Sequence, residues 1–186
     1  MLHGEKVGLR ARQSTDIAVL HAELYDDVAT RSRADSRAWR PVQADSAASP
    51  YHVRDTAADA ACFSVVEIDP EDLAGEALLW GIDSHNRNAH VGISLRPAFR
   101  GRGLGTDVVR VLCHYGFMVL GLQRLQIETL SDNAAMIASA TRCGFRHEGT
   151  LRRSAWALGK FADETIMGLL ASEWSANGPE VAALSS

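Results

Sequence analysis

Apolar and polar positions alternate along the chain in a pattern that predicts a succession of strands and helices. Residues 7–12 read as a short strand, and a helix follows from the capping Thr15 to Leu24. From Cys62 onward the pattern changes to three strands with short turns between them, at residues 63–68, 75–82 and 89–95. Strands joined by turns this short form an antiparallel meander.

The second half of the chain predicts two helices and a closing hairpin. Apolar residues spaced by three and four from Leu104 to Val119 form a helical stripe, and Gly121 ends it. A strand over 125–130 leads to a helix that Asn133 caps and Gly144 closes. Strand character resumes at Phe145 and continues in a hairpin formed by residues 151–156 and 165–170. The predicted order is β-α-loop-βββ-α-β-α-ββ, without an internal repeat.

Residues 30–61 interrupt this regular pattern. They mix charged residues, serines and prolines with two aromatic residues, which indicates a long loop with short helical pieces. Loops of this length are often lids or binding segments, so Trp39, Pro41, Pro50 and Tyr51 are candidates to line or cover one side of a binding site. The alternative interpretation is that they close a small satellite core.

The length and composition indicate one globular domain. The chain has 186 residues, 46% apolar and 23% charged, so we expect a single domain over residues 1–175 and a frayed polar tail over 176–186. No apolar run approaches the ~20 residues that cross a bilayer. The first residues lack a basic patch followed by an apolar core, so we expect no secretory signal, no membrane association and a cytoplasmic location.

The net charge and the cysteines argue against nucleic-acid binding and against a zinc or redox site. A net charge of −4 argues against nucleic acid as a partner, because phosphate-backbone binders carry a clustered positive surplus. One basic cluster exists, at Arg96, Arg100 and Arg102, and it fits a small anionic ligand better than a polymer. The three cysteines are widely spaced, which predicts buried thiols and neither a zinc nor a redox pair.

The segment Arg100-Gly101-Arg102-Gly103-Leu104-Gly105 carries the most specific chemistry. It lies between a predicted strand and the first turn of a helix, where unpaired N–H groups and the helix dipole favour an anion. Glycines would let a pyrophosphate approach the backbone, and the two arginines would add charge-assisted donors. A flexible glycine turn is the simpler alternative. A Walker loop is excluded because no Gly-Lys-Ser/Thr follows.

At this point the sequence resembles the GNAT N-acetyltransferase family, whose pyrophosphate-binding signature is Arg/Gln-x-x-Gly-x-Gly/Ala. Arg100, Gly103 and Gly105 occupy its three defined positions. The segments 101–107, 143–149 and 159–164, together with Asn133, look like the branch that includes the ribosomal-protein N-terminal alanine acetyltransferases. The resemblance covers residues 60–175 and, more loosely, residues 7–24.

The resemblance implies an α+β fold: a mixed, mostly antiparallel central sheet splayed into a V-shaped cleft, with helices on both faces. The third meander strand would bulge at its end and separate from the strand 125–130. Its backbone would pair with the pantetheine arm of the cofactor, the glycine loop would hold the pyrophosphate, and Asn133 would reach the arm from the opposite wall or act as an N-cap alone. The expected cofactor-binding residues are Ile93, Leu95, Arg100, Gly101, Arg102, Gly103, Leu104, Gly105, Thr106 and Asn133.

The reaction that the resemblance implies is transfer of an acyl group from acetyl-CoA, or another acyl-CoA, to a primary amine of a small molecule or of a peptide or protein N-terminus. No metal is required. Glu76 and Glu128 are the candidate catalytic residues, because either carboxylate could relay a proton from the amine through water. His90, His114 and His147 are further candidates, and for all five a structural role is the alternative.

The chain departs from the ribosomal-protein branch at two positions. Met136 stands where that branch has a serine that is thought to assist the thiolate, and we expect the nearby Ser131 and Ser139 to point elsewhere. The glutamate that follows the G-F-x-x-E-G turn in that branch is also missing. These departures suggest one alternative, a catalytically weak acyl-CoA-binding module. The arginines near the cleft, together with Arg152 and Arg153, suggest another, an acyltransferase with a donor such as succinyl-CoA. The expected partners are an acyl-CoA and an amine acceptor, whose side of the cleft Trp39, Pro41, Pro50 and Tyr51 would line or cover, and a homo-oligomer is left open.

Overall fold

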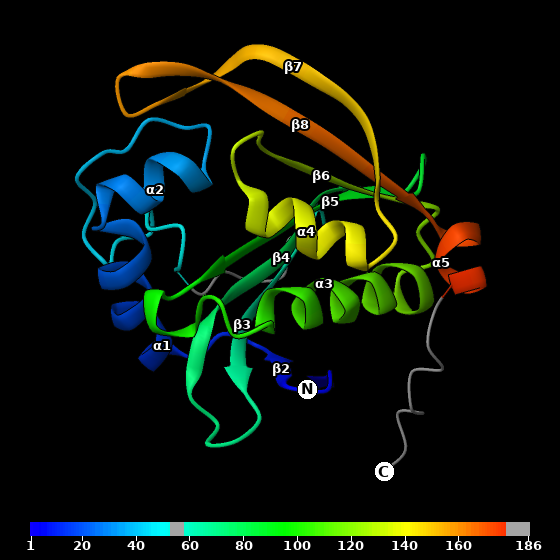
Figure 1. Cartoon of the computed structure of the whole chain (residues 1–186). Coiled ribbons are helices and arrows are strands. Elements are labelled where there is room, and N and C mark those ends of the chain that lie inside the picture. Colours follow the sequence, from blue (N-terminus) through cyan, green and yellow to red (C-terminus); the bar gives the residue numbers. More distant parts are fainter. Residues whose placement is uncertain (53–57, 178–186) are drawn as a thin grey trace.

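One mixed sheet of eight strands forms the centre of the computed structural model, which describes residues 1–52 and 58–177. The strands lie in the order β1-β2-β3-β4-β5-β6-β8-β7 (Figure 1). Their bounds are β1 Leu2–His3, β2 Val7–Arg10, β3 Ala60–Glu67, β4 Leu73–Asp83, β5 Asn88–Leu95, β6 Arg124–Leu130, β7 Arg146–Ala157 and β8 Lys160–Leu170. The predicted meander is β3, β4 and β5, and its antiparallel pairing is confirmed.

The sheet opens between β5 and β6, its one parallel pair in the described chain. The two strands pair only over Asn88–His90 and Arg124–Gln126, at their N-terminal ends. Beyond that point β5 continues to Leu95 on β4, and β6 continues to Leu130 on β8. The two halves of the sheet therefore separate toward the C-terminal ends of β5 and β6, which confirms the expected V-shaped splay.

Helices cover both faces of the sheet. In Figure 1, α3 and α4 lie together in front of the strands. On the opposite face α1 approaches β3, where Ser64 Oγ donates to Asp16 at 2.8 Å. The helical elements are α1 Ser14–Leu20, the π-helical turn η1 His21–Tyr25, α2 Val28–Ala34, the 3-10 turn η2 Pro97–Phe99, α3 Leu104–His114, the π-helical turn η3 Tyr115–Val119, α4 Ala134–Arg142 and α5 Ala171–Asn177. The expected α+β class is thereby confirmed.

The main core lies between the sheet and α3. Val108 and Leu112 on α3 are fully buried against Leu79 on β4 and Leu125 on β6. Their spacing of four places both α3 residues on one helix face, as the apolar stripe predicts. Burial of this stripe fixes α3, and with it the glycine loop that precedes it.

A second, smaller core forms under α1 and the loop that follows α2. Tyr51 is 1% exposed and packs with Leu20, Leu24 and Tyr25, and Trp39 packs against the same cluster. The indole Nε1 of Trp39 donates to the carbonyl of Tyr25 at 3.0 Å. The satellite-core interpretation therefore describes Trp39 and Tyr51 correctly, and their role in covering an acceptor site remains a prediction.

Several local expectations are corrected. The predicted loop 30–61 begins inside α2, and residues 53–57 of it lie outside the described chain. The bulge expected at 93–95 is absent, because β5 pairs with β4 in continuous register there. The register of this pair instead shifts between Trp80 and Asp83.

The structure also contains two elements that were not predicted, the short strand β1 and the helix α5. Residues 176 and 177 of the expected tail belong to α5, and 178–186 lie outside the described chain.

The three cysteines occupy different environments. Cys113 on α3 is buried and Cys143 is half-buried, but Cys62 on β3 is exposed, contrary to the expectation for all three. Burial raises the pKa of the Cys113 thiol well above its usual value and that of Cys143 to about 11. Both thiols are therefore protonated at neutral pH and act as small apolar side chains.

Within the described residues, no helix is long and apolar enough to span a membrane.

Candidate functional site

The glycine loop connects β5, through η2, to the first turn of α3. Gly101 and Gly103 have positive φ angles of 73° and 82°, in the left-handed region that side chains with a Cβ rarely adopt. Gly103 is the N-cap of α3, and no side chain caps this helix. The first N–H groups of α3 are therefore not bonded by a capping side chain, as expected for an anion-binding helix end.

The three arginines of the basic cluster have different partners. Arg102 donates to Glu67 at 2.6 Å, and Arg96 donates to Glu23 and to a backbone carbonyl. Arg100 uses its Nε to bond the carbonyl of Leu95 at 2.9 Å, and no ion pair engages its terminal nitrogens among the described residues. Arg100 is thus the arginine of the cluster that keeps its charge available at the loop.

Two residues near the loop were not found by sequence reasoning. A Cβ built on Gly103 would lie 3.6 Å from Lys6 Nζ, so the turn between β1 and β2 brings an ammonium group to the loop. Ser139 on α4 accepts from Thr106 Oγ1 at 3.2 Å and lies beside Gly105, and its expected direction away from the cofactor thiolate remains a prediction. Both residues reach the loop only through tertiary packing, and no local pattern marks them.

The residues expected to bind the cofactor arm lie on the two sides of the opening. Ile93 and Leu95 are on the part of β5 that has left β6, and their side chains pack against the main core. Asn133 caps α4: its side chain accepts from the N–H of Met136 at 3.3 Å and donates to Thr129 at 2.9 Å. The N-cap role is confirmed, whereas contacts of these three residues with a cofactor remain predictions.

Glu76 is buried on β4 in an ion pair with Arg12. Arg12 Nη2 donates to Glu76 Oε2 at 2.8 Å, and the side chains are 6% and 12% exposed, respectively. The guanidinium group also lies over the ring of Tyr51, 5.3 Å from its centroid. Burial raises the pKa of Glu76, although the positive charge of Arg12 opposes this shift. A carboxylate with a raised pKa is a better proton acceptor near neutral pH.

Glu128 lies on the same face of the sheet as Glu76, on the other side of the opening. Glu76 pairs with Ser94 on β5, and His90 on β5 is in register with Gln126 on β6, so residues two or four positions apart share this face. Glu128 is more exposed than Glu76, at 34%, and its Oε1 is 3.4 Å from His90 Nδ1. The structure thus places one candidate carboxylate on each half of the divided sheet.

The other two candidate histidines, His114 and His147, lie away from the glycine loop and from the opening between β5 and β6. His114 is at the end of α3, on the opposite face of the sheet, with its ring 6.1 Å from that of Trp174. His147 is on β7 and contacts Thr150 at 3.1 Å. Neither histidine is brought to the glycine loop or to the splayed strands, which favours the structural interpretation for both.

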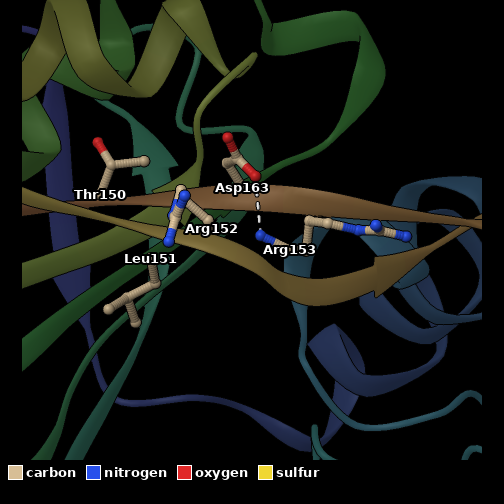
Figure 2. A pocket seen from close by; sticks show the side chains of 5 residues that line it. All are labelled: Thr150, Leu151, Arg152, Arg153 and Asp163. Carbon is tan, nitrogen blue, oxygen red and sulfur yellow. Dashed lines mark hydrogen bonds between the residues drawn. The ribbon is translucent and has the colours of Figure 1, made fainter.

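The hairpin of β7 and β8 forms a shallow pocket of about 640 Å³ (Figure 2). Between Leu151 and Ala155 the strand β7 carries extra residues relative to β8, and Arg153 there has a φ of 53°. Its backbone N–H donates to Asp163 at 2.8 Å, as Figure 2 shows. The side chain of Arg153 runs along the hairpin over Phe161, 5.5 Å from the ring centroid. A neighbouring pocket of about 450 Å³ also includes Asp163.

The sheet opens between two parallel strands beside a glycine loop at a helix N-terminus, which is the arrangement that the family resemblance implied. The sequence profile of the acetyltransferase (GNAT) domain matches residues 6–146. The chain belongs to this family.

Individual relatives agree with this assignment. The chain is 28% identical to the uncharacterized N-acetyltransferase p20 of Bacillus licheniformis over 61% of this chain and 64% of that protein. It is 30% identical to spermidine N(1)-acetyltransferase of Escherichia coli K12 over 60% of each protein. The matched region spans 58–64% of the length of the first curated relatives.

Solved structures share the fold over most of the chain. A spermidine N-acetyltransferase from Vibrio cholerae in complex with CoA and spermine superposes with a TM-score of 0.80 at 23% identity, covering 91% of this chain and 98% of that one. A probable acetyltransferase superposes with a TM-score of 0.79 at 26% identity, covering 91% and 96%. The expected GNAT fold is confirmed.

Proposed function

We propose that this protein is an N-acetyltransferase that transfers an acetyl group from acetyl-CoA to a primary amine. The observation that carries the proposal is the opening between β5 and β6 with the glycine loop at its mouth. The free edge of β5 can accept an extended pantetheine arm as an added strand, and the N-terminus of α3 can accept the pyrophosphate. Membership of the GNAT family and the CoA complex of the Vibrio cholerae structure support this cofactor.

The chemistry requires a neutral amine, a polarised thioester carbonyl and a proton for the leaving thiolate. The amine nitrogen attacks the thioester carbon, a C–N bond forms, the C–S bond breaks, and the sulfur leaves as a thiolate. Of the two candidate carboxylates we favour Glu76 as the group that removes the proton of the amine, because burial raises its pKa. Glu128 is the alternative, since it lies on the splayed part of β6 itself.

The second partner of the proposed reaction is the amine that accepts the acetyl group. Three curated relatives are named for spermidine, so polyamines are one candidate acceptor class, and peptide N-termini, as in the ribosomal-protein branch, are another. On and beside α2, Asp35 pairs with Arg31 and Arg37, and Asp132 pairs with Arg33. Arg31 and Asp35 lie close enough to Glu76 to influence its pKa, so a polycation that reached Glu76 would meet the positive charge of Arg31, which favours acceptors of lower positive charge.

A thiol-release screen tests the proposal. Acetyl-CoA, propionyl-CoA and succinyl-CoA are each combined with spermidine, single-amine small molecules and short peptides with free N-termini, and released CoA is measured with a thiol reagent. We expect release with acetyl-CoA and at least one amine, together with an acetylated product of the corresponding mass. Binding of acetyl-CoA without release above the buffer rate with any amine would instead identify a binding module, and release with succinyl-CoA alone would identify a different donor.

A further inference from the structure

We propose that Lys6 is a phosphate-binding residue of the cofactor site: its ammonium group, delivered by the turn between β1 and β2, pairs with a phosphate of coenzyme A at the glycine loop. This inference rests on the proposed function, because it assigns a residue to the same site. Lys6 is 97 positions before Gly103 in the sequence, and nothing in the glycine motif includes it.

The position of Lys6 is set by a buried carboxylate at the start of α3. Asp107 is 4% exposed, and its Oδ2 accepts from the backbone N–H of Lys6 at 2.8 Å and of Val7 at 3.1 Å. A Cβ on Gly4 would lie 2.4 Å from the same oxygen, so only glycine lets the turn approach this closely. Asp107 therefore ties the N-terminal hairpin to the first turn of α3 and fixes the backbone from which Lys6 extends.

The side chain of Lys6 extends to the glycine loop. Its Nζ lies 3.6 Å from the point that a Cβ of Gly103 would occupy, while the backbone at Lys6 is held by Asp107. Because Gly103 is the N-cap of α3, the ammonium group lies beside the helix end whose N–H groups favour an anion. The helix end and the ammonium group thus place positive charge at the same location from two separate elements.

The charges around the loop indicate an external anion as the partner of Lys6. Across the described residues 1–52 and 58–177, no carboxylate lies within 4.0 Å of Lys6 Nζ, whereas Arg102 is already paired with Glu67. Arg100 retains its terminal nitrogens for the same anion. Two available cations and a helix N-terminus in a chain of net charge −4 match a ligand with several negative charges, which the phosphates of coenzyme A supply.

The composition of the chain provides a matched control. The chain contains only two lysines, Lys6 and Lys160. Lys160 begins β8 at the tip of the far hairpin, and both lysines are exposed. Lys6→Gln and Lys160→Gln therefore remove the same charge from the two sites, and only the first is expected to affect the cofactor.

Calorimetric titration with CoA and with 3′-dephospho-CoA tests the inference. We expect Lys6→Gln to weaken CoA binding about tenfold, as for loss of a charge-assisted contact, and Lys160→Gln to bind as the wild type does. If dephospho-CoA binds the wild type and Lys6→Gln equally, the contact is to the 3′-phosphate; an equal loss with both ligands assigns it to the pyrophosphate. Wild-type affinity of Lys6→Gln for CoA would overturn the inference and leave the proposed function intact. Failure of the wild type to bind CoA would overturn both.

Amine labelling provides a readout that needs no variant. The wild-type protein is treated briefly with N-hydroxysuccinimidyl acetate, with and without saturating CoA, and the two lysine-containing peptides are quantified by mass spectrometry. We expect CoA to slow the modification of Lys6 several-fold and to leave that of Lys160 unchanged. Equal rates at Lys6 with and without bound CoA would contradict the proposed contact.

Discussion

The buried ion pair of Glu76 and Arg12 yields the most informative prediction. If Glu76 accepts the proton of the amine, Glu76→Gln should lower kcat by about a hundredfold or more, which is the usual range for loss of a general base. The glutamine retains an oxygen that can accept from Arg12, which now bonds the carboxylate at 2.8 Å. Affinity for CoA should be unchanged, because the glycine loop is formed by other residues.

Arg12→Gln removes the cation of the same ion pair and leaves the carboxylate of Glu76 in place. It leaves a carboxylate that is 12% exposed without its cation, and breaking a buried pair in this way costs about 3–5 kcal/mol of stability. For a chain of this length, that loss lowers Tm by on the order of 10 °C. The loss should be greater at pH 8 than at pH 5, because a carboxyl group whose folded pKa is raised destabilises the fold only once it ionises.

The pH dependence of turnover connects the two variants to the mechanism. In the wild type, kcat should fall as the pH drops through the raised pKa of Glu76, since the protonated carboxyl group cannot accept a proton. Arg12→Gln should move this acid limb to higher pH, and Glu76→Gln should remove it. Glu128→Gln is the matched control, with the same chemical change on the other half of the sheet.

Steady-state thiol release over a range of pH and thermal unfolding of each variant are the required assays. A Glu76→Gln variant that kept more than a third of the wild-type kcat with an unchanged acid limb would show that Glu76 does not accept the proton. A large loss in Glu128→Gln instead would make Glu128 the proton acceptor and leave the Glu76 pair with a purely structural role.

Three further predictions concern the cofactor loop, the satellite core and the turn before α4. Arg100→Ala should weaken CoA binding by about 1–3 kcal/mol in calorimetry with no change in Tm, because among the described residues its side chain bonds only the carbonyl of Leu95; unchanged affinity would mean that the loop is only a turn. Trp39→Ala should lower stability by about 2 kcal/mol in urea denaturation, since the indole packs in the satellite core, and should raise the KM for the amine, since Trp39 is expected to cover the acceptor side; lost stability with an unchanged KM would leave Trp39 with the packing role alone. Met136→Ser should leave turnover unchanged or higher, because no hydroxyl group there is needed, and should cost about 1 kcal/mol because Met136 packs against the main core; a large loss of turnover would contradict this.

Local patterns in the sequence predicted the elements that depend on nearby residues. The stripe from Leu104 onward places α3 because spacings of three and four put apolar residues on one helix face. Gly101 and Gly103 predicted the tight turn because positive φ angles favour glycine, and Asn133 predicted the start of α4 because a side-chain cap is a local interaction. The family resemblance then supplied the mixed, mostly antiparallel sheet and the splay between β5 and β6, whereas the order of the eight strands came from the structure.

The sequence could not predict contacts between residues far apart along the chain, because side-chain direction and burial depend on the packed fold. The pairing of Glu76 with Arg12, 64 positions away, and the stacking of Arg12 on Tyr51 require β4, the segment after β2 and the satellite core to meet. Lys6 reaches Gly103 only because Asp107 holds the N-terminal hairpin against α3. The sequence by itself thus predicted the glycine turn, whose signal is local, and the fold class, which followed from the family resemblance. Tertiary structure alone decided which charges surround that loop and which candidate carboxylate is buried, since Coulombic interactions and desolvation depend on distance in space.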